Sequence, residues 1–140
     1  LLCWGEPPKE KLPDKLTVKL LGKISDTESL SINYSASDVF ICPSRADNLP
    51  NTVLESLSCG TPLIGSNVGG IPEMIQEDLN GLIFKSNDPM SCYEKILQFK
   101  KNKRKFTYQT KSVREHAELN FSLKKQSDLY REIIFNNFID

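Results

Sequence analysis

The sequence predicts an α/β fold, with a Rossmann-like parallel sheet and helices on both faces. Short apolar segments that end at Gly or Pro alternate with segments of helical periodicity. Strands that alternate with helices favour a parallel sheet covered on both sides. The length of 140 residues corresponds to one domain, so residues 1–140 are assigned to a single unit. In such a sheet, the turns after the strands share the edge where ligands bind.

The order of elements follows from apolar runs and from the residues that end them. Strands are expected at Leu1–Trp4, Thr17–Leu21, Val39–Cys42, Leu63–Gly65 and Leu82–Phe84. Helices are expected at Ser29–Ser37 and Asn51–Cys59, with a short one at Pro72–Ile75. Asp88 is the expected cap of a further helix. The region of about 88–140 is predicted to hold the terminal helices, with two or three helices in the C-terminal third of the chain.

Composition and charge exclude several classes of function. Lys plus Arg and Asp plus Glu balance at 18 each, so no overall field attracts nucleic acid. The four cysteines lie far apart without a CxxC pair, and His116 is the one histidine, so neither a metal site nor a disulfide framework is predicted. Free cysteines fit a reducing cytoplasm. The apolar runs are too short to span a bilayer, and the start without Met suggests a piece of a larger protein.

The segment Asp47 to Gly60, DNLPNTVLESLSCG, contains the strongest candidate site. A helix that begins near Pro50 presents free backbone N–H groups and the positive end of its dipole, which suit a phosphate. Thr52 adds a hydroxyl donor. The carboxylates of Asp47 and Glu55 flank this position and can accept hydrogen bonds from vicinal hydroxyls of a sugar. The alternative is that both carboxylates only stabilise the helix start, by roughly 0.3–1 kcal/mol.

A longer stretch carries a family resemblance. YSASDVFICPSRADNLPNTVLESLSCG, followed by TPLIGSNVGGIPEMI, resembles the donor-binding region of retaining GT-B glycosyltransferases of the "glycosyl transferases group 1" type, glycosyltransferase family 4. The resemblance runs from about Leu1 to Phe84, and more weakly through the terminal helices. It implies that the chain is the nucleotide-sugar-binding C-terminal domain of such an enzyme, truncated at its N-terminal side.

The resemblance also assigns roles around the acidic pair. The E-x7-E motif of the family carries over onto Asp47 and Glu55, with Asp47 standing where the family usually has Glu. Glu55 would accept hydrogen bonds from the ribose hydroxyls, and Asp47 would contact the donor sugar. Backbone groups of Asn48, Leu49 and Pro50 would line the sugar and phosphate side.

Four more residues complete the expected binding site. Thr52 and Val53, at the helix start, would face the diphosphate. Lys23 and Ile24, after the second strand, correspond to the base-binding loop of the family. No residue in the chain resembles a glycosyl nucleophile, so no catalytic residue is assigned beyond the contact of Asp47 with the donor sugar.

By the same resemblance, the parent enzyme transfers a hexosyl unit from a UDP- or GDP-sugar to a glycan or lipid-linked acceptor, in surface polysaccharide synthesis. No metal or other cofactor is expected, because cationic side chains and a helix dipole stabilise the leaving diphosphate. The isolated 140 residues are expected to be inactive, since the family's Arg and Lys and its acceptor domain lie upstream. The alternatives are a GT-B epimerase or sugar phosphorylase domain, and a non-catalytic binding module.

Other conspicuous residues have structural interpretations. Gly69-Gly70 is interpreted as a turn at the sheet edge, since the spacing does not match a phosphate-binding GxGxxG. Cys42 and Cys59 are interpreted as small buried residues. His116 lies in a polar helical stretch far in sequence from the acidic pair, and no catalytic role is predicted for it.

A basic run occupies residues 95–114. The usual explanation of such a run is a solvated helix face. The alternative is peripheral contact with anionic lipid or a lipid-linked diphosphate, which would place the protein at the cytoplasmic face of a membrane.

Overall fold

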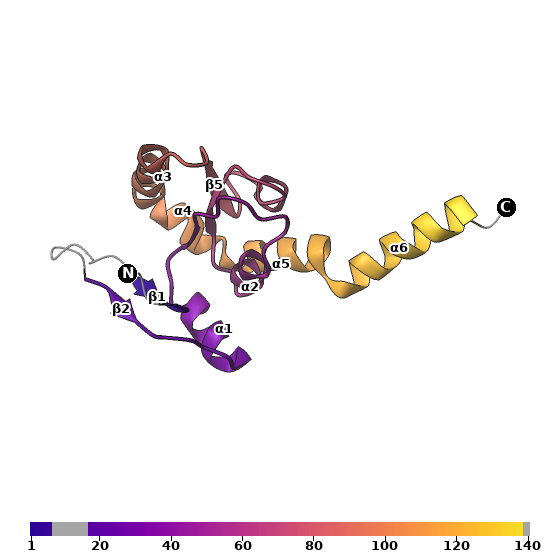
Figure 1. The fold of residues 1–140 in the computed structure, drawn as a ribbon, viewed down its shortest axis with the longest axis horizontal. Coiled ribbons are helices and arrows are strands. Elements are labelled where there is room, and N and C mark those ends of the chain that lie inside the picture. Colours follow the sequence, from indigo (N-terminus) through magenta and orange to yellow (C-terminus); the bar gives the residue numbers. More distant parts are fainter. Residues whose placement is uncertain (7–16, 139–140) are drawn as a thin grey trace.

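The computed structural model describes residues 1–6 and 17–138, and they form parallel strands with helices around them (Figure 1). The first half contains β1 (Leu2–Cys3), β2 (Lys19–Leu20), α1 (Thr27–Ser35), β3 (Phe40–Cys42), α2 (Asn51–Ser58) and β4 (Leu63–Ser66). The second half contains the 3₁₀ helix η1 (Pro72–Met74), β5 (Gly81–Phe84), α3 (Pro89–Lys101), α4 (Lys103–Tyr108), α5 (Thr110–Phe121) and α6 (Leu123–Phe138). The predicted α/β class is confirmed.

The strands pair in parallel, but in two sheets rather than the single sheet that the sequence predicted. One sheet consists of β1 and β2, and the other has the order β3-β4-β5. In the second sheet Ile41 is opposite Ile64, and Ile64 is opposite Leu82. Aromatic rings join the two sheets, because the Trp4 ring, after β1, stacks on the Phe40 ring in β3 with centroids 6.1 Å apart.

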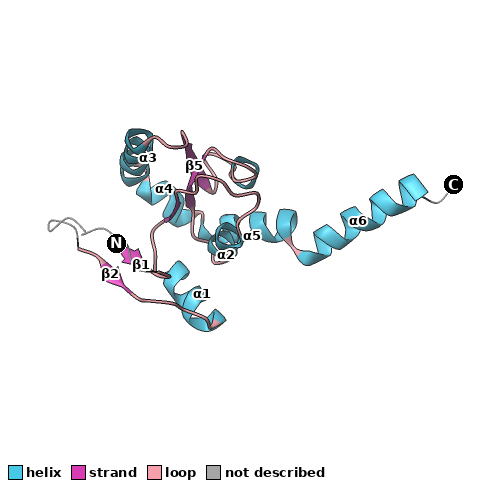
Figure 2. Cartoon of the chain, viewed as in Figure 1, coloured by secondary structure: helices cyan, strands magenta, loops and turns pink. Residues whose placement is uncertain are grey.

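The three-stranded sheet is covered on both faces (Figure 2). Leu63 in β4 belongs to a buried cluster with Leu57 of α2 and Val113 of α5. The next residue, Ile64, points to the opposite face, where it packs in a second cluster with Phe99 of α3 and Phe106 of α4. This alternation is the period of two expected for a strand buried on both sides. Helix α2 is therefore fixed between the sheet and α5.

Capping residues set the starts of two helices. Asp88 accepts a hydrogen bond from the backbone N–H of Ser91 at 3.0 Å, which confirms it as the cap of α3. Helix α1 begins at Thr27, two residues before the predicted start, because Asp26 accepts a hydrogen bond from the N–H of Ser29 at 2.7 Å. The same bond lowers the pKa of the Asp26 carboxyl, since it favours the charged form.

The C-terminal region differs from the expectation of two or three helices. In the described residues after Phe84 there are four, α3 to α6, with breaks at Asn102, Gln109 and Ser122. Helix α6 extends away from the sheet (Figure 1). Its apolar periodicity, including Ile133, is not buried, so the pattern predicted the helix but not a packed position for it. Within the described ranges, no helix is both long and apolar enough to cross a bilayer.

Candidate functional site

The loop Asp47–Pro50 lies between the carboxyl end of β3 and the start of α2, as expected. The side chains of Asp47 and Asn48 are exposed, whereas Pro50 is buried. The hydroxyl of Ser66, at the end of β4, donates to the Ser44 carbonyl oxygen at 2.7 Å. The loop therefore follows the end of β3, which is hydrogen-bonded to the end of β4, and it presents polar side chains to solvent.

The first turn of α2 has free donors. Pro50 is the cap residue and offers no side-chain hydrogen bond to the helix. The N–H of Val53 donates to the Pro50 carbonyl at 3.0 Å, and the Val53 side chain is fully buried. In the described part of the chain, the N–H groups of Asn51 and Thr52 have no acceptor, as expected for the first residues of a helix. Val53 therefore anchors the helix, and the backbone N–H groups of Asn51 and Thr52 remain available to a ligand.

The Gly69-Gly70 segment supports the loop from the neighbouring strand. The N–H of Gly70 donates to the carbonyl oxygen of Asn48 at 2.6 Å. A Cβ at Gly69 would overlap the carbonyl oxygen of Asp47, and Gly69 has a φ of +51°, which L side chains rarely adopt. This arrangement supports the interpretation of the two glycines as a turn. They also allow two backbone segments to pack in direct contact, a role that the sequence did not reveal.

Glu55 is anchored on one side by a buried tyrosine. The Tyr34 hydroxyl donates to Oε2 of Glu55 at 3.0 Å. Tyr34 is only 1% exposed, whereas Glu55 is exposed. Burial is the main cause that raises the pKa of Tyr34, and the hydrogen bond and charge of Glu55 raise it further. The hydroxyl therefore stays a donor, and Glu55 keeps a free side toward solvent.

Sequence reasoning missed the partnership between Tyr34 and Glu55. The two residues are 21 positions apart, and no spacing rule links them. The available signal was chemical, because a buried tyrosine hydroxyl usually requires a polar partner.

Lys23 and Ile24 lie in the segment between β2 and α1, with Lys23 exposed and Ile24 half-buried. This places them after the carboxyl end of β2, where the resemblance puts a base-binding loop. Within the described residues they form no hydrogen bond with Asp47–Pro50 or with Glu55. The structure therefore brings together the loop, the start of α2 and the glycine pair, and within the described residues no hydrogen bond joins Lys23 or Ile24 to them.

His116 has a structural position in α5. Its Nδ1 lies 3.3 Å from Nδ2 of Asn80, and its ring packs edge-on against Phe121. Asn80 is fully buried, donates to the Met74 carbonyl at 3.0 Å and accepts from the Gln76 N–H at 2.8 Å. His116 is therefore a neighbour of a buried amide that organises the turn before β5.

We expect Asn80→Ala to lower the free energy of unfolding by about 2 kcal/mol, because buried backbone groups lose their partners. Chemical denaturation followed by circular dichroism measures this change. Asn120→Ala is the matched control, since Asn120 is exposed and its side chain donates to the His116 carbonyl of its own helix; we expect a change within about 0.5 kcal/mol. Equal effects of the two substitutions would contradict the role of Asn80.

The cysteines of the chain are free thiols. Cys42 is buried, as predicted, and Cys59 is half-buried, with its pKa raised mainly by burial. A raised pKa disfavours the reactive thiolate. Among the residues that the structure describes, no group of three potential ligands could hold a metal ion.

The basic run is partly neutralised by acidic residues of the same surface. Lys103 Nζ lies 2.8 Å from Oδ1 of Asp38. Lys105 is 2.8 Å from Oδ1 of Asp78, and this contact lowers the pKa of the Asp78 carboxyl. Lys95 lies 3.8 Å from Glu77. These pairs favour the solvated helix face over a concentrated positive patch.

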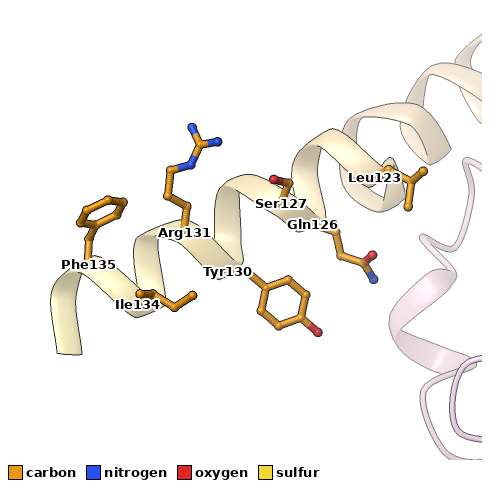
Figure 3. A pocket seen from close by; sticks show the side chains of 7 residues that line it. All are labelled: Leu123, Gln126, Ser127, Tyr130, Arg131, Ile134 and Phe135. Atoms are coloured by element: carbon orange, nitrogen blue, oxygen red, sulfur yellow. The ribbon is translucent and has the colours of Figure 1, made fainter. Parts of the chain in front are cut away.

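Neither of two open grooves on the molecule is lined by Asp47, Thr52 or Glu55. The larger, about 500 Å³, follows α6, where Arg131 and Phe135 project to one side of the helix and Tyr130 to the other (Figure 3). The smaller, about 260 Å³, lies between α2 and α5 and is lined in part by Arg114 and Ser58. The residues of the candidate site therefore lie outside both of these grooves.

The sequence matches the family described as Glycosyl transferases group 1 over residues 9–116. The chain belongs to this family. A curated relative, the sulfoquinovosyl transferase SQD2 of Arabidopsis thaliana, is 32% identical over 120 residues, which cover 81% of this chain and 24% of the relative. This group 1 chain thus spans about a quarter of the length of that protein.

Solved structures agree with the assignment of this group 1 chain. A sucrose-phosphate synthase from Thermosynechococcus elongatus superposes with a TM-score of 0.72 at 27% identity, over 86% of this chain and 31% of that one. HepE from Anabaena in complex with UDP gives a TM-score of 0.72 at 19% identity, over 85% of this chain and 32% of that one. The GT-B fold implied by the resemblance is confirmed.

Proposed function

We propose that this chain is the donor-binding part of a retaining glycosyltransferase that transfers a hexosyl unit from a nucleotide-diphosphate sugar. The observation that carries the proposal is the position of Glu55 relative to the free donors of α2. Thr52 and Glu55 are three residues apart, so they share one face of the helix and lie about 4.5 Å apart along its axis. A ribose on the Glu55 carboxylate thereby brings its phosphates to the N–H groups of Asn51 and Thr52.

The loop before the helix supplies the sugar side of the proposed site. The exposed carboxylate of Asp47 is available to sugar hydroxyls. The carbonyl of Asn48 is held by Gly70, which fixes the path of the backbone through Leu49 to Pro50. Lys23 and Ile24 are proposed to contact the base. Structures of HepE with UDP and with UDP-glucose support a nucleotide-sugar ligand for this fold.

The remaining parts of the proposal concern the whole enzyme. The acceptor is a glycan or lipid-linked sugar used in surface polysaccharide synthesis, and the donor is a UDP- or GDP-sugar. The chain spans about a third or less of these relatives and neighbours, so we expect sugar transfer to need residues beyond these 140. The proposed location is the cytoplasm, at a membrane face. There the exposed side chains of Lys100, Lys101 and Arg104 would contact anionic lipid.

Nucleotide titration tests the donor-binding role. We expect UDP or GDP to shift backbone amide signals of Asn51 and Thr52 in NMR spectra, a method that detects weak binding. Glu55→Gln should weaken this binding about tenfold, because a charged hydrogen-bond acceptor is replaced by a neutral one. Glu94→Gln on α3 is the control, since Glu94 is exposed and lies on another helix. Binding of neither nucleotide, or binding that survives Glu55→Gln unchanged, would contradict the proposal.

A further inference from the structure

We infer that Tyr34 is a positioning residue for the nucleotide's ribose, because its buried hydroxyl holds the Glu55 carboxylate in place; the inference rests on the proposed role of Glu55 as ribose ligand. The hydroxyl donates to Oε2 of Glu55 at 3.0 Å. No other side chain among the described residues bonds to Glu55. This one contact therefore restricts an otherwise mobile glutamate on the helix surface.

Tyr34 is itself fixed at both its ring and its backbone. Its ring packs edge-on against Trp4 at 5.0 Å and against Phe40 at 5.5 Å between centroids. Its carbonyl oxygen accepts a hydrogen bond from the hydroxyl of Thr61 at 2.7 Å, and the Thr61 carbonyl in turn accepts from Ser56 at 3.0 Å. The path from Tyr34 through Thr61 thus returns to α2 beside Glu55. These contacts hold the Tyr34 side chain in one rotamer, so its hydroxyl has a fixed position.

The geometry leaves the carboxylate able to bind a diol. An ionised carboxylate offers about four acceptor positions, of which the Tyr34 hydroxyl occupies one. The rest remain for two adjacent hydroxyls on the exposed side of Glu55. Holding the acceptor in place before the ligand arrives reduces the ordering cost of binding. The Tyr34 hydroxyl also stays protonated and does not repel the carboxylate, because burial and the hydrogen bond and charge of Glu55 raise the pKa of Tyr34.

Tyr34→Phe tests the inference, because it removes the hydroxyl and keeps the ring that packs on Trp4 and Phe40. We expect affinity for UDP to fall about tenfold. Affinity for 2′,3′-dideoxy-UDP should be unchanged, because that nucleotide lacks the hydroxyls that Glu55 would bind. A role of Tyr34 in the general stability of the fold would change both affinities equally. Tyr130→Phe on the exposed α6 is the matched control and should change neither.

The outcomes separate this inference from the proposed function. The donor site stands if the unaltered chain binds UDP and Glu55→Gln weakens that binding. The positioning role is overturned if, in addition, Tyr34→Phe leaves the preference for UDP over the dideoxy nucleotide intact. If no nucleotide binds, a cycle of Tyr34→Phe, Glu55→Ala and the double variant still tests the contact through unfolding free energies, because alanine removes the acceptor that glutamine would keep. Non-additive changes would support the hydroxyl–carboxylate contact, and additive changes would overturn it.

Discussion

Gly69→Ala is expected to lower the free energy of unfolding by about 3 kcal/mol and to displace the loop Asp47–Pro50. Two costs add at this position. The new Cβ would overlap the carbonyl oxygen of Asp47, and alanine would have to adopt the positive φ of +51°. Because the obstruction is backbone rather than a flexible side chain, relief requires movement of the loop. Nucleotide binding should therefore weaken together with stability.

Gly22→Ala separates the two costs. Gly22 also has a positive φ, +68°, but a Cβ there would meet nothing within 4 Å. It should therefore show only the conformational cost of about 1 kcal/mol. Denaturant titration of both variants measures the difference. If Gly69→Ala is no more destabilising than Gly22→Ala, the close packing of the glycine pair against Asp47 is not significant for stability.

Leu57→Ala is expected to cost about 3 kcal/mol and to loosen the helix that carries Glu55. Leu57 is fully buried, in the cluster that α2 shares with Leu63 of β4 and Val113 of α5. Removing most of its side chain leaves a cavity between the sheet and α5 in addition to the lost burial. The position of α2 relative to the sheet depends on this layer.

The matched control is Leu119→Ala on α5, where the leucine is 71% exposed. We expect a change within about 0.5 kcal/mol. Thermal unfolding followed by circular dichroism, with nucleotide titration of the same samples, measures both consequences. A Leu57→Ala variant as stable as Leu119→Ala would contradict the assignment of this cluster as the core beneath the candidate site.

The sequence predicted the elements around the candidate site closely, because their ends carry strong local signals. Pro50 and Gly60 bound α2, and Asp88 caps α3, where the structure has them. Helix α1 begins two residues before its predicted start, because Asp26 caps it. Around the candidate site, local patterns thus predicted the helices and strands to within a few residues, whereas the number of helices after Phe84 was predicted too low.

Tertiary contacts were less accessible to prediction. The sequence did not predict that the strands divide into two sheets. Nor did it predict the packing of Gly69 against Asp47 or the bond from Tyr34 to Glu55, because each of these contacts joins residues far apart in the chain. Periodicity reports which face of an element is apolar, but not which neighbour covers it. The apolar pattern of α6 illustrates the point, because the described contacts leave it uncovered.

Helix α6 has a consequence for how the chain melts. This helix is 16 residues long, and those of its side chains that the structure describes contribute little to the buried clusters that hold the sheet and helices α2 to α5 together. An isolated helix of this length is close to the helix–coil midpoint in water. Fraying of α6 is thus decoupled from the cooperative unfolding of the sheet, and the chain has a stable foldon that carries Glu55 and a separate segment in local equilibrium.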